Sequence, residues 1–372
     1  MITGLLNVEF LVLLLACERM KIMNKIRIGI IGCGVIAPSH LESYRKLPDV
    51  ELVWACDLVE AKARQMAADY GIANTTTDFR RVLKDKSVAG VSICTDHASH
   101  APLAVAALKA GKHVLCEKAL SSTTAKMNAM LAAHAKRPEL VFAGVFQHRF
   151  EPVVRYLKRM VDEGKFGAIL TANTQVFCLR TNAYYQADKW RGTWEMEGGS
   201  VLINQAIHFI DSLAWIMGGV ESVFGTCANL THQGVIETED TATAALRFKS
   251  GALGTIEATS SSHFGWDSTL SIHGTAGSVE MRNNKSTKLV FGDKALEERV
   301  KAEMVDLADG PALTVGKDYY GTGHPAQIAD FVDAIRSNRP PFIPAASARH
   351  TVEIVLAIYK SHQTGRRVVV KN

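Results

Sequence analysis

The chain has 372 residues, more than one ordinary compact domain contains, so two domains are expected. Hydrophobic residues make up 47% of the chain and the formal net charge is only +5, which excludes an intrinsically disordered protein. The small positive charge comes without a basic run or a basic-aromatic stripe, so no nucleic-acid partner is expected.

Residues 1–24 precede the first predicted strand and form an N-terminal extension, either a mis-assigned start or a weak signal-like segment. Residues 10–17 are apolar, but Glu9 stands where a signal peptide carries positive charge, and the run is too short to cross a membrane. The seven cysteines are scattered through apolar runs and predict free thiols of a reducing compartment. We expect a cytoplasmic protein without a membrane partner; export or lipidation through residues 10–17 is the alternative.

Residues 25–150 alternate between short apolar strands and helices. Strands are predicted at residues 26–31, 50–56, 88–94, 114–118 and 140–146, and helices up to about residue 46 and at about 59–70, 102–110 and 125–136. This alternation predicts a Rossmann domain, which is a doubly wound parallel sheet with helices on both faces.

A glycine-rich turn follows the first strand and opens a helix. Its candidate cofactor-binding residues are Gly32, Gly34, Val35, Ile36 and Ala37. The first glycine allows the tight turn, the second lets the backbone approach a pyrophosphate, and the helix N-terminus supplies donors. Asp57 ends the next strand, where a carboxylate binds the adenosine ribose and repels a 2′-phosphate, so NAD is preferred over NADP.

Two further strand ends contribute polar side chains to the same edge of the predicted sheet. Thr95, His97 and His100 follow one strand, and we interpret them as a turn against the nicotinamide ribose rather than as metal ligands. Glu117 and Lys118 end another strand. Unpaired charge is costly beside a buried strand, so a site function is favoured over a surface ion pair.

Residues 151–372 show a different pattern and predict an α+β domain with a large, mainly antiparallel open sheet. Strands are expected at residues 169–177, 220–228, 241–248, 253–260 and 269–273, and helices at about 201–217, 327–336 and 348–361.

The first of those helices carries a polar stripe on an otherwise apolar surface. Ser200 can cap it and Gly218 can end it. Asn204, His208 and Asp211 are spaced so that they share one face, which we expect to line a cavity. His208 is the natural proton acceptor, because imidazole titrates near neutral pH.

Together these motifs resemble the glucose–fructose oxidoreductase/inositol dehydrogenase/MocA family from about residue 25 to the end of the chain. The matching features are the Glu117-Lys118 strand end, the Gln147-His148-Arg149-Phe150 segment and the Gly198-Gly199…His208…Asp211 helix. The tail from His324 to Ile335 also matches. The resemblance implies an NAD(P)-dependent enzyme acting on a ring hydroxyl or carbonyl of a sugar, sugar acid or cyclitol. It further implies a homodimer or homotetramer assembled through the C-terminal sheet.

The resemblance also implies functions for individual residues. Lys118 would hydrogen-bond the reacting oxygen and His208 would exchange its proton. Gln147 would join Glu117 and Lys118 at the cofactor. The remaining residues expected at the substrate are Arg149, Trp190, Arg191 and Asn204, where Arg191 could bind an acidic sugar or form a structural ion pair.

Three positions depart from the family pattern. Ala119 stands where the family has proline after the lysine, Asn204 stands where many relatives have aspartate, and Asp96 replaces a common proline. The substitution at Asn204 removes a carboxylate one turn before His208 and puts substrate choice in doubt. Two other functions remain open: an NAD-dependent sugar sensor without turnover, and a redox-assisted NAD-dependent glycosidase.

Overall fold

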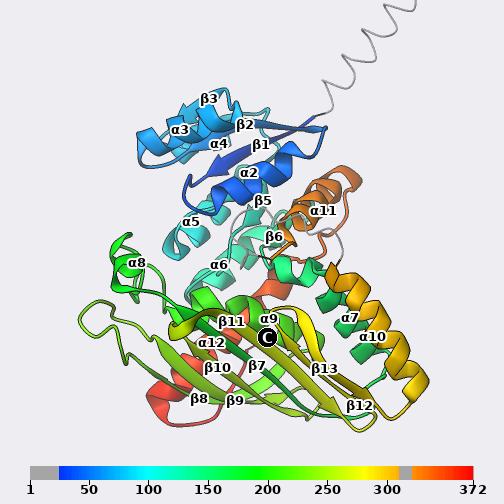
Figure 1. Cartoon of the computed structure of the whole chain (residues 1–372). Coiled ribbons are helices and arrows are strands. Elements are labelled where there is room, and N and C mark those ends of the chain that lie inside the picture. The colour runs from blue at the N-terminus through cyan, green and yellow to red at the C-terminus, as the bar shows by residue number, and fades with distance from the viewer. Residues whose placement is uncertain (1–24, 310–320, 372) are drawn as a thin grey trace, which may run out of the picture.

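A computed structural model of the protein describes residues 25–309 and 321–371. The predicted N-terminal extension, with its 10–17 segment and Cys17, lies outside these residues. Figure 1 shows a smaller parallel sheet at the top and a larger sheet at the bottom, with helices between them.

The upper sheet confirms the predicted Rossmann fold. Its six strands are parallel and lie in the order β3-β2-β1-β4-β5-β6. The strands are β1 (Ile26–Ile31), β2 (Val50–Cys56), β3 (Asn74–Thr76), β4 (Gly90–Ile93), β5 (His113–Cys116) and β6 (Phe142–Gly144). Strand order reverses between β1 and β4, which is where ligands bind in sheets of this kind.

Five helices belong to this sheet: α2 (Ala37–Arg45), α3 (Glu60–Tyr70), α4 (Phe79–Lys84), α5 (His97–Lys109) and α6 (Thr124–Ala135). Neither β3 nor α4 was predicted from the sequence. Strand β3 is a polar three-residue edge strand and α4 has only six residues, so neither leaves a periodic apolar pattern to find.

The lower sheet confirms the predicted large, mainly antiparallel sheet. Its eight strands lie in the order β13-β12-β11-β7-β10-β9-β8-β14, and only β7 and β10 pair in parallel. The strands are β7 (Ile169–Leu179), β8 (Val220–Ala228), β9 (Thr241–Phe248), β10 (Leu253–Thr259), β11 (Ser261–Gly274), β12 (Gly277–Arg282), β13 (Lys285–Phe291) and β14 (Val368–Val369). The sequence analysis did not predict β12, β13 or β14.

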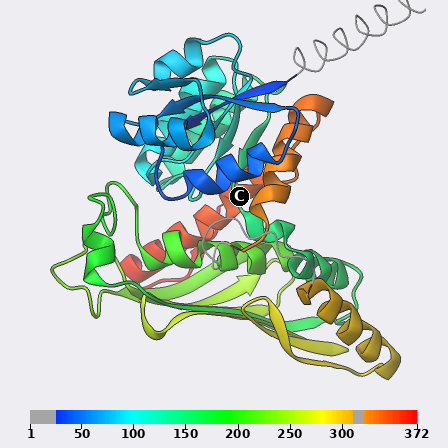
Figure 2. The ribbon, with the colours of Figure 1, turned by 45° about the horizontal axis from the view of Figure 1, so that its top comes forward.

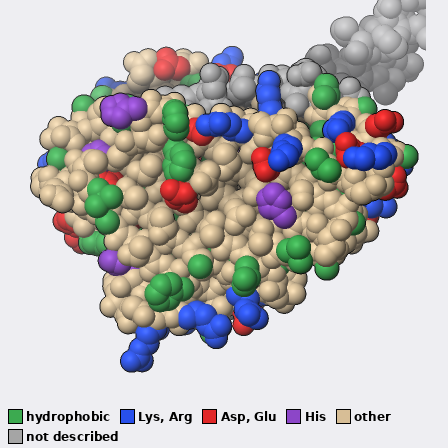
Figure 3. Space-filling model, turned by 60° about the horizontal axis from the view of Figure 1, so that its bottom comes forward, with side chains coloured by type: hydrophobic (Ala, Val, Ile, Leu, Met, Phe, Trp, Pro, Cys, Tyr) green, Lys and Arg blue, Asp and Glu red, His purple; other side chains and the backbone are tan. Residues whose placement is uncertain are grey.

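Helices cover the face of the lower sheet that is turned toward the Rossmann part, as Figure 2 shows. The helices that follow β6 in the described residues are η1 (Gln147–Phe150), α7 (Pro152–Asp162), α8 (Asn182–Gln186), η2 (Val201–Ala206), α9 (Ile207–Ile216), α10 (Lys294–Asp309), α11 (His324–Ser337) and α12 (Ala345–Thr364). Of these, α11 lies on the Rossmann part instead. Helix α9 packs on β7 and α12 packs on β8. Figure 3 views the molecule from below and shows hydrophobic side chains scattered among charged ones rather than gathered in one patch.

Helix α11 returns from the C-terminal half to the Rossmann sheet. It packs on α2, and its Phe331 belongs to the same buried cluster as Leu41 and Ile30. Pro344 also forms a bridge with Ala143 next to β6. The division into residues 25–150 and 151–372 stays a prediction, and α11 contacts the first of these parts from within the second.

The described cysteines form no disulfide. Cys33, Cys56, Cys94, Cys116 and Cys178 are buried and Cys227 is half-buried. Across residues 25–309 and 321–371, no helix combines the length and the apolar character needed to cross a membrane. The cytoplasmic location stays a prediction.

Candidate functional site

The glycine-rich turn between β1 and α2 has the shape needed to hold a phosphate. Gly32 has φ +95°, and a Cβ there would lie 2.6 Å from the backbone of Cys94. A Cβ on Gly34 would meet no atom within 4 Å, so the side of the turn that a pyrophosphate would approach is open. The backbone N–H groups of Val35 and Ile36 donate no hydrogen bond within the described part of the chain. The turn therefore fits the phosphates of a dinucleotide.

Asp57 lies directly beside this turn, at the end of β2. Its Oδ2 accepts a hydrogen bond from the backbone N–H of Cys33 at 2.8 Å, and its Oδ1 accepts one from Val59 at 2.8 Å. Leu58 and Val59 follow with exposed apolar side chains. The carboxylate is thus fixed at the turn, in the position expected for a ribose contact.

Glu117 is buried just past the end of β5 and is surrounded by histidines. Its Oε1 lies 2.8 Å from His40 Nε2 and 4.0 Å from His324 Nε2. Burial alone would raise the pKa of Glu117, but the hydrogen bond from His40 and nearby positive charge lower it to about 2. Its Oε2 accepts the backbone N–H of Lys118 at 3.1 Å, so an ionised carboxylate fixes the start of the lysine segment.

The three groups Glu117, His40 and His324 are also of the kinds that bind metal ions. However, His40 and Glu117 are in direct hydrogen-bonding contact, closer than two ligands of one zinc ion would lie. The other ring nitrogen of His40 lies 3.2 Å from Ser92 Oγ. The arrangement is that of a hydrogen-bonded support for the lysine.

The Lys118 side chain extends from this support toward the lower sheet. Its Nζ donates to Asn204 Oδ1 at 2.7 Å and to the Asn204 carbonyl at 3.0 Å. The peptide bond between Lys118 and Ala119 is cis, although alanine stands in place of the family's proline. Burial lowers the pKa of Lys118 from 10.5 to about 8, so the ammonium can lose its proton under mild conditions.

His208 lies one helical turn after Asn204, and both residues are partly exposed. Its Nδ1 is buried and has no hydrogen-bond partner among the described residues. The ring packs against Phe146 and against His148, whose centroid is 5.1 Å away. Burial, followed by positive charge at His148 and Lys118, holds the pKa of His208 well below 6.5. The imidazole is therefore neutral at pH 7 and able to accept a proton.

The polar stripe expected on this helix is only partly correct. The segment begins as a π-helix, η2, and becomes α-helical from Ile207, so Asn204 and Asp211 do not share one regular helical face. Asp211 is fully buried, and both of its oxygens accept hydrogen bonds from Arg149, at 2.7 and 2.6 Å. Ser200 makes no cap; its hydroxyl bonds Tyr185 instead. The left-handed Gly218 directly after the helix agrees with the predicted end.

Arg149 and Asp211 form a structural pair in this arrangement. The third nitrogen of Arg149 donates to Ser347 at 2.8 Å, and Thr351 donates to Asp211 at 2.6 Å, so η1, α9 and α12 are joined. The hydrogen bonds of the Arg149 side chain go to Asp211 and Ser347, on the side of α9 and α12. Gln147, from the same segment, is buried beside the start of α11.

The other predicted residues lie around the lysine. His100 Nδ1 is 2.7 Å from the carbonyl of Ala119, and His97 Nδ1 is 2.8 Å from the carbonyl of Glu197. The rings of His97 and Trp190 are 5.4 Å apart. The prediction that the two histidines form a turn is wrong, because α5 begins at His97, capped by Asp96, and contains both of them. Both help to hold the backbone around the lysine. Thr95 lies in the turn against Gly32, as its contact with a Cβ placed on that glycine shows.

Arg191 forms an ion pair with Asp188 at 3.0 Å and stacks on Tyr184, 4.3 Å from the ring centre. A second arginine, Arg180, donates to Gln205 and also stacks on Tyr184, at 5.0 Å. The positive charges of both arginines lower the pKa of Lys118. The side of the lysine nearest the lower sheet thus carries two arginines together with the Glu197 carboxylate, which raises the lysine pKa.

Sequence reasoning missed Glu197, which lies in the loop before η2. It is 1% exposed, and its carboxylate accepts hydrogen bonds from the Asn204 side chain and from the backbone N–H of Gly192. Its sequence context, among turn residues and next to an exposed glutamate, resembles an ordinary surface loop. His40 and His324 were missed as partners of Glu117 for a related reason: they lie far from it in sequence.

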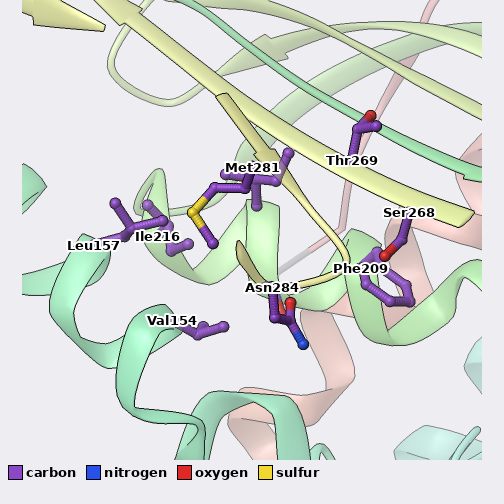
Figure 4. A pocket seen from close by; sticks show the side chains of 10 residues that line it. Val154, Leu157, Phe209, Ile216, Ser268, Thr269, Met281 and Asn284 are labelled. Carbon is purple, nitrogen blue, oxygen red and sulfur yellow. The ribbon is translucent and has the colours of Figure 1, made fainter. Parts of the chain in front are cut away.

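A small cavity lies elsewhere, between α7, α9 and the strands β11 and β12. Figure 4 shows mostly apolar side chains around it, including Val154, Leu157, Ile216 and Met281. None of the predicted site residues lines this cavity, which is therefore separate from the candidate site.

Comparison with known proteins gives two family matches. Residues 26–145 match the NAD-binding Rossmann fold of the Gfo/Idh/MocA oxidoreductase family, and residues 158–370 match the C-terminal alpha/beta domain of the same family.

Individual relatives cover nearly the whole chain. Myo-inositol 2-dehydrogenase of Thermotoga maritima is 28% identical over 92% of this chain and 98% of its own length. Levoglucosan dehydrogenase of Pseudarthrobacter phenanthrenivorans is 26% identical over 82% of each chain. The WlbA dehydrogenase of Bordetella pertussis, solved with NADH and UDP-GlcNAcA, superposes with a TM-score of 0.85. It is 27% identical, and the match covers 94% of this chain and 99% of that one.

Proposed function

Because the chain belongs to the Gfo/Idh/MocA oxidoreductase family, whose two models match most of its length, we propose a reaction at the Lys118 site. The protein transfers a hydride between NAD and a ring hydroxyl or carbonyl of a sugar, sugar acid or cyclitol. The observation that carries this proposal is a half-buried lysine of lowered pKa. Its partner Asn204 lies one helical turn before a neutral, half-buried histidine.

The proposed chemistry divides the work between the two side chains. The Lys118 ammonium donates a hydrogen bond to the reacting oxygen and stabilises negative charge that develops on it. His208 accepts the hydroxyl proton during oxidation and returns it during reduction. As the carbonyl forms, the C–H bond breaks and its electron pair leaves with the hydrogen. The cofactor supplies the hydride acceptor at nicotinamide C4.

The turn of Gly32, Gly34, Val35, Ile36 and Ala37 would bind the cofactor pyrophosphate. Asp57 would bind the adenosine ribose, and its fixed negative charge favours NAD over NADP. We also propose contacts with the nicotinamide half of the cofactor, made by Thr95, His97, His100, Glu117 and Gln147.

The substrate class is supported by the names of relatives and by charge. Relatives are named for myo-inositol and levoglucosan, and one solved neighbour holds a nucleotide sugar acid. Trp190 lies against His97, and Arg191 stacks on Trp190; both would contact the ring of the substrate. Arg180 and Arg191 near Lys118 are the side chains that would bind a carboxylate or phosphate group of such a substrate.

The test is NADH absorbance with purified protein, NAD or NADP, and a panel of inositols, sugars, sugar acids and nucleotide sugar acids. Lys118→Ala should lower kcat at least about 100-fold while leaving NAD affinity near that of the wild type. The exposed Lys109→Ala is the matched control and should behave as wild type. Near-normal turnover by Lys118→Ala would refute the function proposed for that residue.

The panel also separates the competing functions. Hydrolysis of a chromogenic glycoside without net NADH formation would indicate the redox-assisted glycosidase. NAD binding without turnover of any substrate would indicate the sensor.

A further inference from the structure

Asn204 connects Lys118 to a second carboxylate. A side-chain amide has one acceptor atom and one donor atom, and a lysine ammonium can only donate. The Asn204 oxygen must therefore face Lys118, which it does at 2.7 Å, and its nitrogen must point the other way. There the nitrogen donates to Oε1 of Glu197.

The second oxygen of Glu197 has a partner of its own. Oε2 accepts the backbone N–H of Gly192, and the carbonyl of Glu197 lies 2.8 Å from His97 Nδ1. Both carboxylate oxygens thus face donors, an arrangement that only the ionised form satisfies completely. Protonation would turn one oxygen into a donor, and because the Gly192 N–H cannot move away, the proton would face the Asn204 amide.

We propose that Glu197 is a positioning residue of the hydride-transfer site: its ionised carboxylate fixes the orientation of the Asn204 amide and thereby holds the Lys118 ammonium at the reacting oxygen. The inference rests on the function proposed for Lys118. It also explains how the site accommodates asparagine in place of the family's aspartate. The Glu197 carboxylate does not contact the lysine directly; the Asn204 amide lies between them and hydrogen-bonds both.

The charges around Glu197 make its ionisation responsive to pH. Arg191 and Lys118 face it with positive charge, and the buried Glu239 faces it with negative charge. Three phenols, Tyr184, Tyr185 and Tyr359, also act on it electrostatically, and the His97 ring contacts its backbone carbonyl. Burial raises the pKa of Glu197 from 4.5 to about 7. Loss of its charge near neutral pH would release the amide and the lysine together.

The first variant is Glu197→Gln. Its amide cannot accept from both Asn204 and Gly192, so kcat should fall by about 10-fold or more while NAD affinity changes little. The acid limb of the kcat/KM profile near pH 7 should disappear. The basic limb, which belongs to Lys118, should move below pH 8, because the Glu197 charge raises the lysine pKa. Glu195→Gln, an exposed glutamate in the same loop, is the matched control.

The second variant, Glu197→Gln with Asn204→Asp, moves the carboxylate directly onto the lysine. We expect it to recover most of the lost kcat and to return the basic limb toward its original pH. A residue that only packs the loop would show no such rescue. Unchanged kcat and pH profile in Glu197→Gln, or a loss that the double variant does not reverse, would overturn the proposal.

Asn204→Asp alone provides an isosteric check that does not depend on how Glu197→Gln folds. It sets two carboxyl groups against each other without a donor between them, so the acid limb should move to higher pH. An unmoved acid limb would contradict the proposal. If Lys118→Ala is inactive while these three variants behave as wild type, only the positioning function of Glu197 fails. If Lys118→Ala is active, the proposed function itself fails.

Discussion

Lys118 has a pKa of about 8 because burial disfavours its charged form more than Glu117 and Glu197 stabilise it. The ammonium is present below that pH and is lost above it. If the charged form holds the reacting oxygen, kcat/KM for sugar oxidation should fall above pH about 8. Titration of His208 should not change kcat/KM near pH 7, because its pKa is well below 6.5.

The control for this expectation is Lys118→Arg, whose guanidinium keeps its proton throughout the accessible range. Any activity that this variant retains should continue to higher pH. A basic limb at the same pH in both proteins would assign that limb to another group.

Some residues of the candidate site could be predicted from the sequence and others could not. Lys118 and His208 could be predicted, because each is a polar residue placed at a strand end or on an apolar helix. Glu197 could not, because it lies in a loop without a periodic pattern. Its contacts with Gly192 and Asn204 depend on how that loop and the π-helix fold, and His97 comes from a distant part of the chain.

At the scale of elements, the glycines of the turn from β1 to α2 serve two purposes, stability of the turn and access for the cofactor, which substitutions can separate. Gly34→Ala should leave stability unchanged, because its Cβ meets no atom within 4 Å. The same Cβ would occupy the approach to the pyrophosphate, so NAD affinity should fall by about 10-fold or more. Fluorescence titration with NADH and thermal unfolding measure the two effects. A stable variant with normal NADH affinity would contradict the binding function of this turn.

Gly32→Ala is the counterpart in the same turn. Its backbone is left-handed and the added Cβ would collide with Cys94, so this variant should lose stability as well as cofactor binding.

The buried pair of Arg149 and Asp211 joins three helical elements. Asp211→Ala would leave the guanidinium buried without its partner, which costs about 3–5 kcal/mol. We expect a clearly lowered unfolding temperature, measured by calorimetry without ligand. The exposed Arg64 pairs with Glu60 on α3, and Arg64→Ala should change stability by less than about 0.5 kcal/mol. Equal effects of the two substitutions would show that the buried pair does not join the elements.

The helix that contains His208 shows that a local sequence pattern predicts the presence of a helix better than it predicts which residues share one side of it. Apolar composition identified a buried helix correctly, but the π-helical start rotates Asn204 relative to Asp211. The Asn204 side chain in this π-helical segment contacts the Lys118 ammonium and the Glu197 carboxylate, neither of which a helical period reveals.

For the whole molecule, we expect a homodimer or homotetramer that forms through the outer face of the lower sheet. Thr243 and Ala245 are exposed on that face of β9. Because identical surfaces meet at a twofold interface, Thr243→Arg with Ala245→Arg would bring like charges together. Sedimentation velocity should show a smaller species for this variant, while the exposed Lys109→Glu keeps the wild-type mass. An unchanged mass in the arginine variant would place the interface elsewhere.

The sequence by itself determined the two kinds of sheet, the cofactor turn and the lysine at the end of β5. These features follow from local periodicity, from glycine spacing and from the rule that parallel strands end at one edge. The tertiary structure alone decided that α11 completes the Rossmann part, that Arg149 pairs with Asp211, and that His97 contacts the carbonyl of Glu197. The physical reason is the range of the interactions: the first set depends on neighbours along the chain, whereas each of the others joins segments that only folding brings together.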